Sequence, residues 1–75
     1  MSVVLYSQPG CQPCNLTKKM LEKLDIKHEV RDIRDDPEAF KRVQELGYRG
    51  TPVVETSTGE HWKDFRPDRL KALVA

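Results

Sequence analysis

The sequence predicts an α/β domain in which a four-stranded mixed β-sheet is flanked by three helices. Apolar residues alternate between short runs typical of buried strands and the three-to-four-residue spacing of amphipathic helices, in the order strand, helix, strand, helix, strand, strand, helix. A strand, helix and strand in succession form a right-handed parallel crossover, whereas two strands in direct succession form an antiparallel hairpin. Together these units predict one mixed sheet covered by helices.

The first strand and the first helix are separated by a change of hydrophobic period. Residues 2–6 form a short apolar run with β-branched residues, and residues 8–10, Gln-Pro-Gly, close it as a loop. The helical pattern begins at Pro13, a residue that suits a first helical turn. The apolar face of this helix is predicted to hold Leu16, Met20, Leu21 and Leu24.

The second strand has a weaker signal than the helix that follows it. Residues 26–33 carry a few apolar side chains among charges and lie between two clearer helices. Asp36 is a good N-cap, Pro37 suits the first turn, and Gly47 stands where a left-handed C-terminal residue belongs. The apolar face of this helix is predicted to hold Phe40, Val43 and Leu46.

The last third of the chain predicts a β-hairpin and a short helix. Residues 53–55 and 60–62 read as two strands joined by the polar turn at residues 56–59. The final helix is predicted to begin at Pro67. Its apolar stripe is predicted to hold Leu70, Leu73 and Val74.

Length and composition exclude several classes of protein. Seventy-five residues, with 33% charged and 37% hydrophobic, predict one compact domain over residues 1–75. The net charge is +1, and acidic and basic residues are interspersed, so the sequence does not suggest a surface for nucleic acid. No apolar run approaches the roughly 20 residues of a membrane span, and no signal-peptide pattern opens the chain. We expect a monomer in the reducing cytoplasm.

The cysteines of the chain are Cys11 and Cys14, in a C-x-x-C motif. A disulfide between such close neighbours closes almost no loop and would add little stability, so the pair is explained by reactivity. The partial positive charge of a helix N-terminus favours a thiolate, so the thiol pKa of Cys11 should lie below the reference of about 8.5. We therefore predict a dithiol–disulfide oxidoreductase with Cys11 as nucleophile and the more buried Cys14 as resolving thiol.

A metal-binding module is the competing interpretation of the same motif. C-x-x-C is also half of a zinc motif, but the chain has no second C-x-x-C, and His28 and His61 fit no usual ligand spacing. A module that holds zinc, or an iron–sulfur cluster through Cys11, stays open as a less favoured alternative. A purely structural cysteine pair is the remaining alternative.

Three segments of the chain carry a resemblance to a known family. They are residues 6–14, Tyr-Ser-Gln-Pro-Gly-Cys-Gln-Pro-Cys; residues 50–54, Gly-Thr-Pro-Val-Val; and residues 61–68, His-Trp-Lys-Asp-Phe-Arg-Pro-Asp. With them the chain resembles the NrdH-type redoxins of the glutaredoxin-like group. The first two segments occur across the thioredoxin superfamily, whereas the third is similar to the Trp-Ser-Gly-Phe-Arg-Pro-Asp stretch specific to NrdH redoxins.

The resemblance implies a fold, an activity and partners. It implies the thioredoxin fold and electron donation to the large subunit of a class Ib ribonucleotide reductase, with no bound cofactor. The electrons would come from NADPH through thioredoxin reductase. Cys11 and Cys14 would be the redox pair and Pro52 a cis-proline beside them, so that the backbone around Thr51 could pair with an extended substrate segment. The remaining residues implied to lie near the site are Trp62, Phe65 and Arg66.

Each of these carried-over residues also has a plain structural alternative. Without the family, Thr51 and Pro52 are the start of a strand. Trp62 and Phe65 could be core aromatics that cover the sheet. The Arg66 side chain could offset nearby acids such as Asp64 or Asp68 on a solvated face, where such pairs are worth only about 0–1 kcal/mol.

The sequence also departs from the family in two places that matter. Lys63 and Asp64 replace the Ser-Gly of the family stretch, which adds two charges and puts any conformation that needs glycine in doubt. Gln8 stands where many glutaredoxin-like chains carry a lysine, and residues 58–61 offer nothing close to the glutathione-binding residues typical of glutaredoxins. Gln8 and residues 58–61 argue against glutathione binding, so a glutathione-dependent glutaredoxin is the main alternative function rather than the first.

Overall fold

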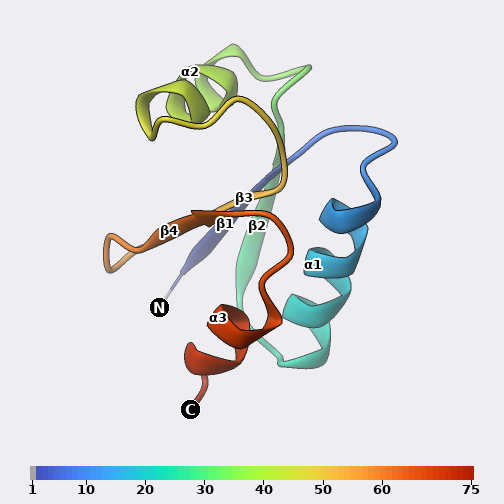
Figure 1. The fold of residues 1–75 in the computed structure, drawn as a ribbon, viewed down its shortest axis with the longest axis vertical. Coiled ribbons are helices and arrows are strands. Elements are labelled where there is room, and N and C mark those ends of the chain that lie inside the picture. Colours follow the sequence, from blue (N-terminus) through green and yellow to red (C-terminus); the bar gives the residue numbers. More distant parts are fainter. Residues whose placement is uncertain (1) are drawn as a thin grey trace.

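A computed structural model describes residues 2–75 and confirms the predicted fold class and element order (Figure 1). The sheet order is β2-β1-β3-β4, with β1 and β2 parallel and the other two pairings antiparallel. The crossover and the hairpin are therefore both as predicted. The elements are β1 (Val3–Ser7), α1 (Gln12–Lys23), β2 (His28–Asp32), α2 (Pro37–Glu45), β3 (Val53–Thr56), β4 (His61–Lys63) and α3 (Pro67–Ala72).

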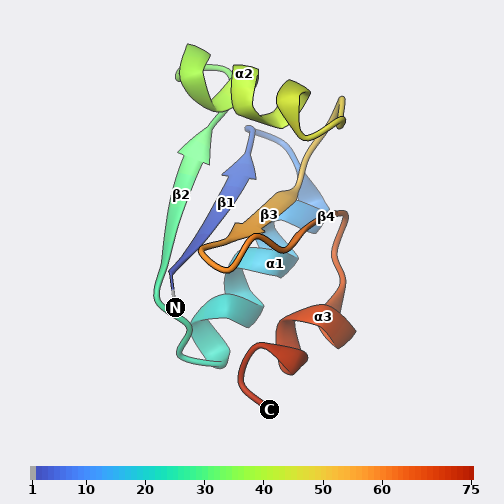
Figure 2. The ribbon, with the colours of Figure 1, turned by 90° about the vertical axis from the view of Figure 1, so that its left-hand side faces the viewer.

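The helices form two layers around the sheet. Figures 1 and 2 show α1 and α3 together on one face and α2 alone on the other. Each face has its own apolar cluster because side chains alternate between the two faces of a strand. The cluster under α1 and α3 contains Val3, Leu5, Leu21, Ile26, Val54, Trp62 and Leu70. The cluster under α2 contains Tyr6, Ala39, Val43 and Val53.

Helix α1 begins with Cys11 as its N-cap. Cys11 has extended backbone angles, φ −94° and ψ 105°, and its Sγ accepts a hydrogen bond from the Cys14 N–H. The predicted apolar face of this helix is wrong at Leu16, whose side chain is 47% exposed. The buried residues Cys14, Thr17 and Leu21 recur every three or four positions, and Leu16 falls outside that stripe.

Helix α2 has the ends that the sequence predicts. The Asp36 carboxylate accepts hydrogen bonds from the N–H groups of Glu38 and Ala39, and Gly47 has φ +91° just beyond the helix. The predicted face is wrong at Phe40, which is 46% exposed, whereas Ala39 is fully buried. The helix packs on the sheet through the small alanine, and this rotation turns the neighbouring phenylalanine outward.

Helix α3 packs on the sheet through Leu70, which is fully buried, with Leu73 partly buried beside the same cluster. The prediction that Val74 belongs to this stripe is wrong, because its side chain is 52% exposed. Val74 lies beyond Ala72, the last residue of the helix, so the helical period no longer sets its direction.

A partly exposed polar contact attaches α2 to the sheet. Tyr6 of β1 donates its hydroxyl hydrogen to Glu55 of β3 over 3.0 Å, and Arg42 of α2 donates to the same carboxylate over 3.1 Å. Burial, together with the hydrogen bond to Glu55, raises the pKa of Tyr6 to about 12. The hydrogen bond from Arg42 outweighs partial burial and lowers the pKa of Glu55 below its ordinary value.

This contact predicts that Glu55→Gln makes stability less dependent on acid. Because the folded-state pKa of Glu55 is lowered, its charge stabilises the fold above about pH 5, and that contribution is lost as the pH falls through the folded-state pKa. The variant should be less stable than the wild type at about pH 6 but lose less stability between about pH 5 and about pH 3. Urea unfolding across this range measures the difference.

The matched control is Glu22→Gln, on the exposed side of α1. It should retain the acid dependence of the wild type. A Glu55→Gln curve parallel to the wild-type curve would show that the Arg42 contact does not contribute to pH-dependent stability.

Candidate active site

Cys11 and Cys14 form a disulfide at the start of α1, with their Cα atoms 5.2 Å apart. The two residues differ in exposure, because Cys11 is the cap and Cys14 lies one turn inside the helix. Cys11 is partly exposed, whereas Cys14 is 1% exposed. A partner that approaches this end of the helix therefore reaches the Cys11 sulfur first.

Two hydrogen-bond donors face the Cys11 sulfur. The backbone N–H of Cys14 lies 3.2 Å from Sγ, and the Thr51 hydroxyl lies 3.6 Å from it. Such donors favour a negative charge on sulfur when the bond is reduced. The structure thus brings Thr51 to Cys11 across forty positions of sequence.

The Thr51–Pro52 bond is cis, as the resemblance implies. Pro52 is buried, and its carbonyl accepts a hydrogen bond of 2.9 Å from the N–H of Asp64. This bond ties the segment after β4 to the loop beside Cys11. The sequence alone did not indicate it, since it joins backbone groups of two separate segments.

The aromatic and basic residues of the third segment have contacts within the fold. Trp62 is 3% exposed in the cluster under α1 and α3, and Phe65 packs partly buried against that cluster. Arg66 pairs with Asp68 over 3.1 Å, and this hydrogen bond lowers the pKa of Asp68. Within residues 2–75, none of the three side chains forms a hydrogen bond with the cysteine sulfurs.

Asp64 occupies the position of the glycine in the family stretch. Its φ is +76°, in the left-handed region that glycine enters freely and aspartate tolerates better than most residues. Lys63 pairs with its carboxylate over 3.2 Å on the surface. The conformation that glycine would allow is therefore retained here by an aspartate.

In the described part of the chain, no three His, Cys, Asp or Glu side chains are grouped as ligands for one metal ion. None of the helices in residues 2–75 is both long and apolar enough to cross a membrane.

Comparison with known sequences identifies the family. The sequence profile of the family Glutaredoxin matches residues 3–62, which include both cysteines and Pro52. The chain belongs to the glutaredoxin family. The glutaredoxin-like protein NrdH of Lactococcus lactis strain IL1403 is 34% identical over 72 residues, which cover 96% of this chain and 99% of that protein. NrdH of Escherichia coli K12 is 30% identical over 73 residues and 89% of its length.

Other relatives include a phage protein and a solved structure. The Gene 56 protein of Mycobacterium phage D29 is 30% identical over 73 residues, 81% of its length. The NrdH-redoxin structure from Escherichia coli superposes with a TM-score of 0.89 at 30% identity, covering 97% of this chain and 95% of that one. The fold is therefore the thioredoxin fold, and the chain is an NrdH-type, glutaredoxin-like thiol oxidoreductase with a C-x-x-C pair.

The left-handed backbone at Asp64 gives a prediction about this NrdH-type redoxin. Asp64→Gly should leave the free energy of unfolding unchanged or raise it by up to about 1 kcal/mol, because glycine relieves the conformation but loses more backbone entropy. Asp64→Val should lower it by about 1–2 kcal/mol, since a β-branched residue is strained there. Chemical denaturation of the oxidised proteins measures both changes.

Lys63→Ser serves as the control for the exposed ion pair, which should be worth about 0–1 kcal/mol. Equal losses for the glycine and valine variants would mean that the ion pair, and not the backbone conformation, explains the contribution of Asp64.

Proposed function

We propose that this redoxin reduces protein disulfides as an electron donor to a class Ib ribonucleotide reductase, and that thioredoxin reductase reduces it with electrons from NADPH. The observation that carries the proposal is the asymmetry of the pair: Cys11 is partly exposed and faces two hydrogen-bond donors, whereas Cys14 is 1% exposed. The NrdH relatives support the ribonucleotide reductase partner. The thioredoxin-like activity profile described for the Escherichia coli NrdH-redoxin supports the reductase.

The proposed cycle begins when thioredoxin reductase delivers two electrons, and two protons convert the Cys11–Cys14 disulfide to two thiols. The Cys11 thiolate attacks one sulfur of the substrate disulfide, which forms a mixed disulfide and releases the other substrate sulfur as a thiolate that takes up a proton. The Cys14 thiolate then attacks the Cys11 sulfur. The intramolecular disulfide re-forms, and the second substrate thiol leaves.

The two donors on Cys11 assist the first exchange step of this cycle. The Cys14 N–H and the Thr51 hydroxyl stabilise the Cys11 thiolate that attacks the substrate disulfide. Burial keeps Cys14 from external disulfides. One helical turn separates the two residues, so Cys14 reaches the mixed disulfide without a rearrangement of the helix.

Substrate docking is assigned to the loop beside the cysteines. The backbone around Thr51 and Pro52 would pair with an extended segment of the partner by main-chain hydrogen bonds, which tolerate many sequences. Phe65 and Arg66 would contact the partner from the third segment, and Trp62 would hold that segment from the core. In this assignment the redoxin acts as a monomer in the cytoplasm.

In this proposal glutathione is a poor reductant of the redoxin. Gln8 supplies no cation beside Cys11, where a lysine would help to hold a glutathione carboxylate. A glutathione-dependent glutaredoxin is nevertheless the main alternative, because the family profile is that of glutaredoxins. A metal analysis of freshly purified protein tests the zinc and iron–sulfur alternative.

The roles of the cysteines predict a one-sided trapping result. Cys14→Ser should accumulate a mixed disulfide with an oxidised protein substrate, because the resolving thiol is missing. Cys11→Ser should accumulate none, since the remaining thiol is buried. Non-reducing gels and mass spectrometry measure the adduct. The reverse pattern would assign the nucleophile to Cys14.

The choice of reductant predicts the outcome of two parallel assays. NADPH consumption by the oxidised redoxin should proceed with thioredoxin reductase and should be slow with glutathione plus glutathione reductase. Thioredoxin and a glutathione-dependent glutaredoxin are the positive controls for the two assays. Turnover with glutathione alone would identify a glutaredoxin, and a class Ib ribonucleotide reductase that is not reactivated would overturn the assigned substrate.

A further inference from the structure

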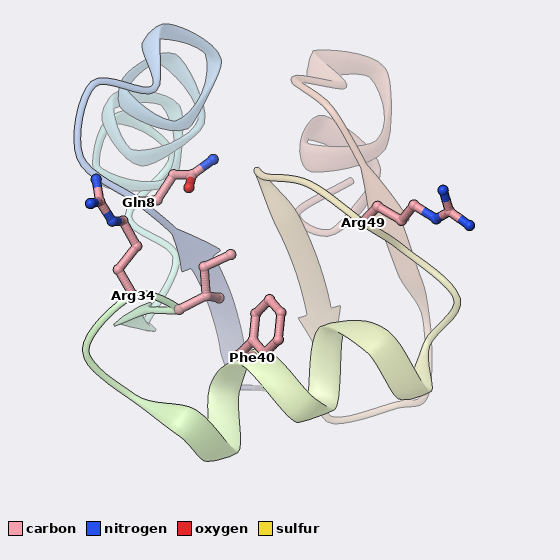
Figure 3. A pocket seen from close by; sticks show the side chains of 5 residues that line it. Gln8, Arg34, Phe40 and Arg49 are labelled. Atoms are coloured by element: carbon pink, nitrogen blue, oxygen red, sulfur yellow. The ribbon is translucent and has the colours of Figure 1, made fainter.

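A pocket of about 410 Å³ lies beside the active-site loop, between that loop and α2 (Figure 3). In Figure 3, Gln8 and Arg34 are on one side, Phe40 rises from α2, and Arg49 extends from the opposite wall with its guanidinium directed outward. The residues that line the pocket are Gln8, Ile33, Arg34, Phe40 and Arg49. Neither the proposed thiol chemistry nor the proposed main-chain docking uses these side chains.

The topology places this pocket at the edge of the sheet that carries the cysteines. Gln8 directly follows β1, and Ile33 directly follows β2, so both stand at the carboxyl ends of adjacent parallel strands. Arg49 is two positions before Thr51, whose hydroxyl contacts Cys11. Crevices at this edge of an open α/β sheet are the usual place for ligands.

The two arginines of the pocket differ from the others in the chain. Within residues 2–75, neither Arg34 nor Arg49 has a carboxylate partner within 4.0 Å, and both are exposed. Each of the remaining arginines is paired. These pairs are Arg31 with Glu29, Arg42 with Glu45 and Glu55, Arg66 with Asp68, and Arg69 with Glu60.

Among the described residues, Arg34 has no carboxylate partner although its own loop is acidic. The Asp32 carboxylate accepts the backbone N–H of Arg34 over 2.8 Å, and the Asp36 carboxylate caps α2. The Arg34 guanidinium lies instead on the side of the pocket that Gln8 occupies (Figure 3). A guanidinium in this position is available to a carboxylate from outside the chain.

Phe40 adds an apolar contact to this charged surface. It is 46% exposed, and the helix that carries it is held to the sheet by Ala39 and Val43, so the ring is not needed for packing. Aromatic and arginine side chains are the types enriched where protein partners bind.

We propose that this pocket binds an acidic segment next to the disulfide of the substrate protein, with Arg34 and Arg49 pairing with its carboxylates and Phe40 packing against an apolar neighbour. The inference rests on the proposed function, since it assigns the substrate preference of the same site. The arginines stand on opposite walls of an open pocket, so they suit carboxylates spaced along a peptide better than one small anion.

The test uses three disulfide peptides that are identical except for flanking Glu, Gln or Lys residues. The pre-reduced redoxin is mixed with each peptide, and its oxidation is followed by acid quench and thiol labelling, so that no reductase is needed. The Glu peptide should react about three- to tenfold faster than the Gln peptide, because exposed pairs contribute modestly and steer association. The Lys peptide should be slowest, and the differences should shrink with salt.

The double variant Arg34→Gln/Arg49→Gln should bring the Glu-to-Gln rate ratio close to one. Arg31→Gln, an exposed arginine already paired with Glu29, is the matched control and should keep the wild-type ratio. Circular dichroism confirms that the variants are folded. A wild-type ratio of one, or a ratio that survives in the double variant, overturns the proposal.

Two further measurements distinguish a site for acidic peptides from a small-anion site and from a failure of the proposed function. If glutathione disulfide reacts as fast as the Glu peptide and loses that rate in the double variant, the pocket is a small-anion site and the proposal is overturned. If the redoxin reduces insulin but treats the three peptides alike, only the pocket assignment fails. If it reduces neither insulin nor any peptide, the proposed function fails and the inference fails with it.

Discussion

The position of Cys11 at the N-cap of α1 is the constraint on which the rest of the site depends. The helix starts close to the carboxyl end of the buried strand β1, and Gly10, with φ +77°, allows the chain to turn between them. Once the cap is fixed, the helical register carries Cys14 one turn inward. One piece of local geometry thus determines which sulfur is accessible, which is buried, and how far apart they are.

The segment at residues 61–68 supports the site mainly through its backbone. Trp62 fixes β4 in the core, and Arg69 of α3 lies over its ring at 4.8 Å from the centroid. Two residues later, the Asp64 N–H reaches the Pro52 carbonyl and holds the loop that brings Thr51 to Cys11. The buried Trp62 side chain therefore anchors this segment in the core. The backbone hydrogen bond from Asp64 to Pro52 then holds the loop in place beside Cys11.

The features that the sequence predicts correctly are those that depend on residues close together in the chain. The Asp36 cap, the left-handed Gly47 and the strand-to-helix change at the cysteines depend on neighbouring residues, so a single sequence reveals them. Leu16 and Phe40 were wrongly placed in the core because hydrophobic spacing does not fix how a helix is rotated against a sheet. Contacts between distant segments, such as Thr51 with Cys11, leave no periodic signal in one sequence, and here the family resemblance alone predicts that Pro52 lies beside the cysteines.

The exposure of Phe40 also explains how a binding surface can lie beside such a small core. Since Ala39 provides the close contact with the sheet, the chain can expose an aromatic ring without a loss of packing. Main-chain pairing at Thr51 would accept almost any extended segment, so discrimination between substrates has to come from side chains around it. Exposed arginines such as Arg34 and Arg49 contribute too little binding free energy to hold a partner after thiol–disulfide exchange. They contribute enough to raise the association rate of the preferred disulfide. That balance suits a reductant that must release its product at every turnover.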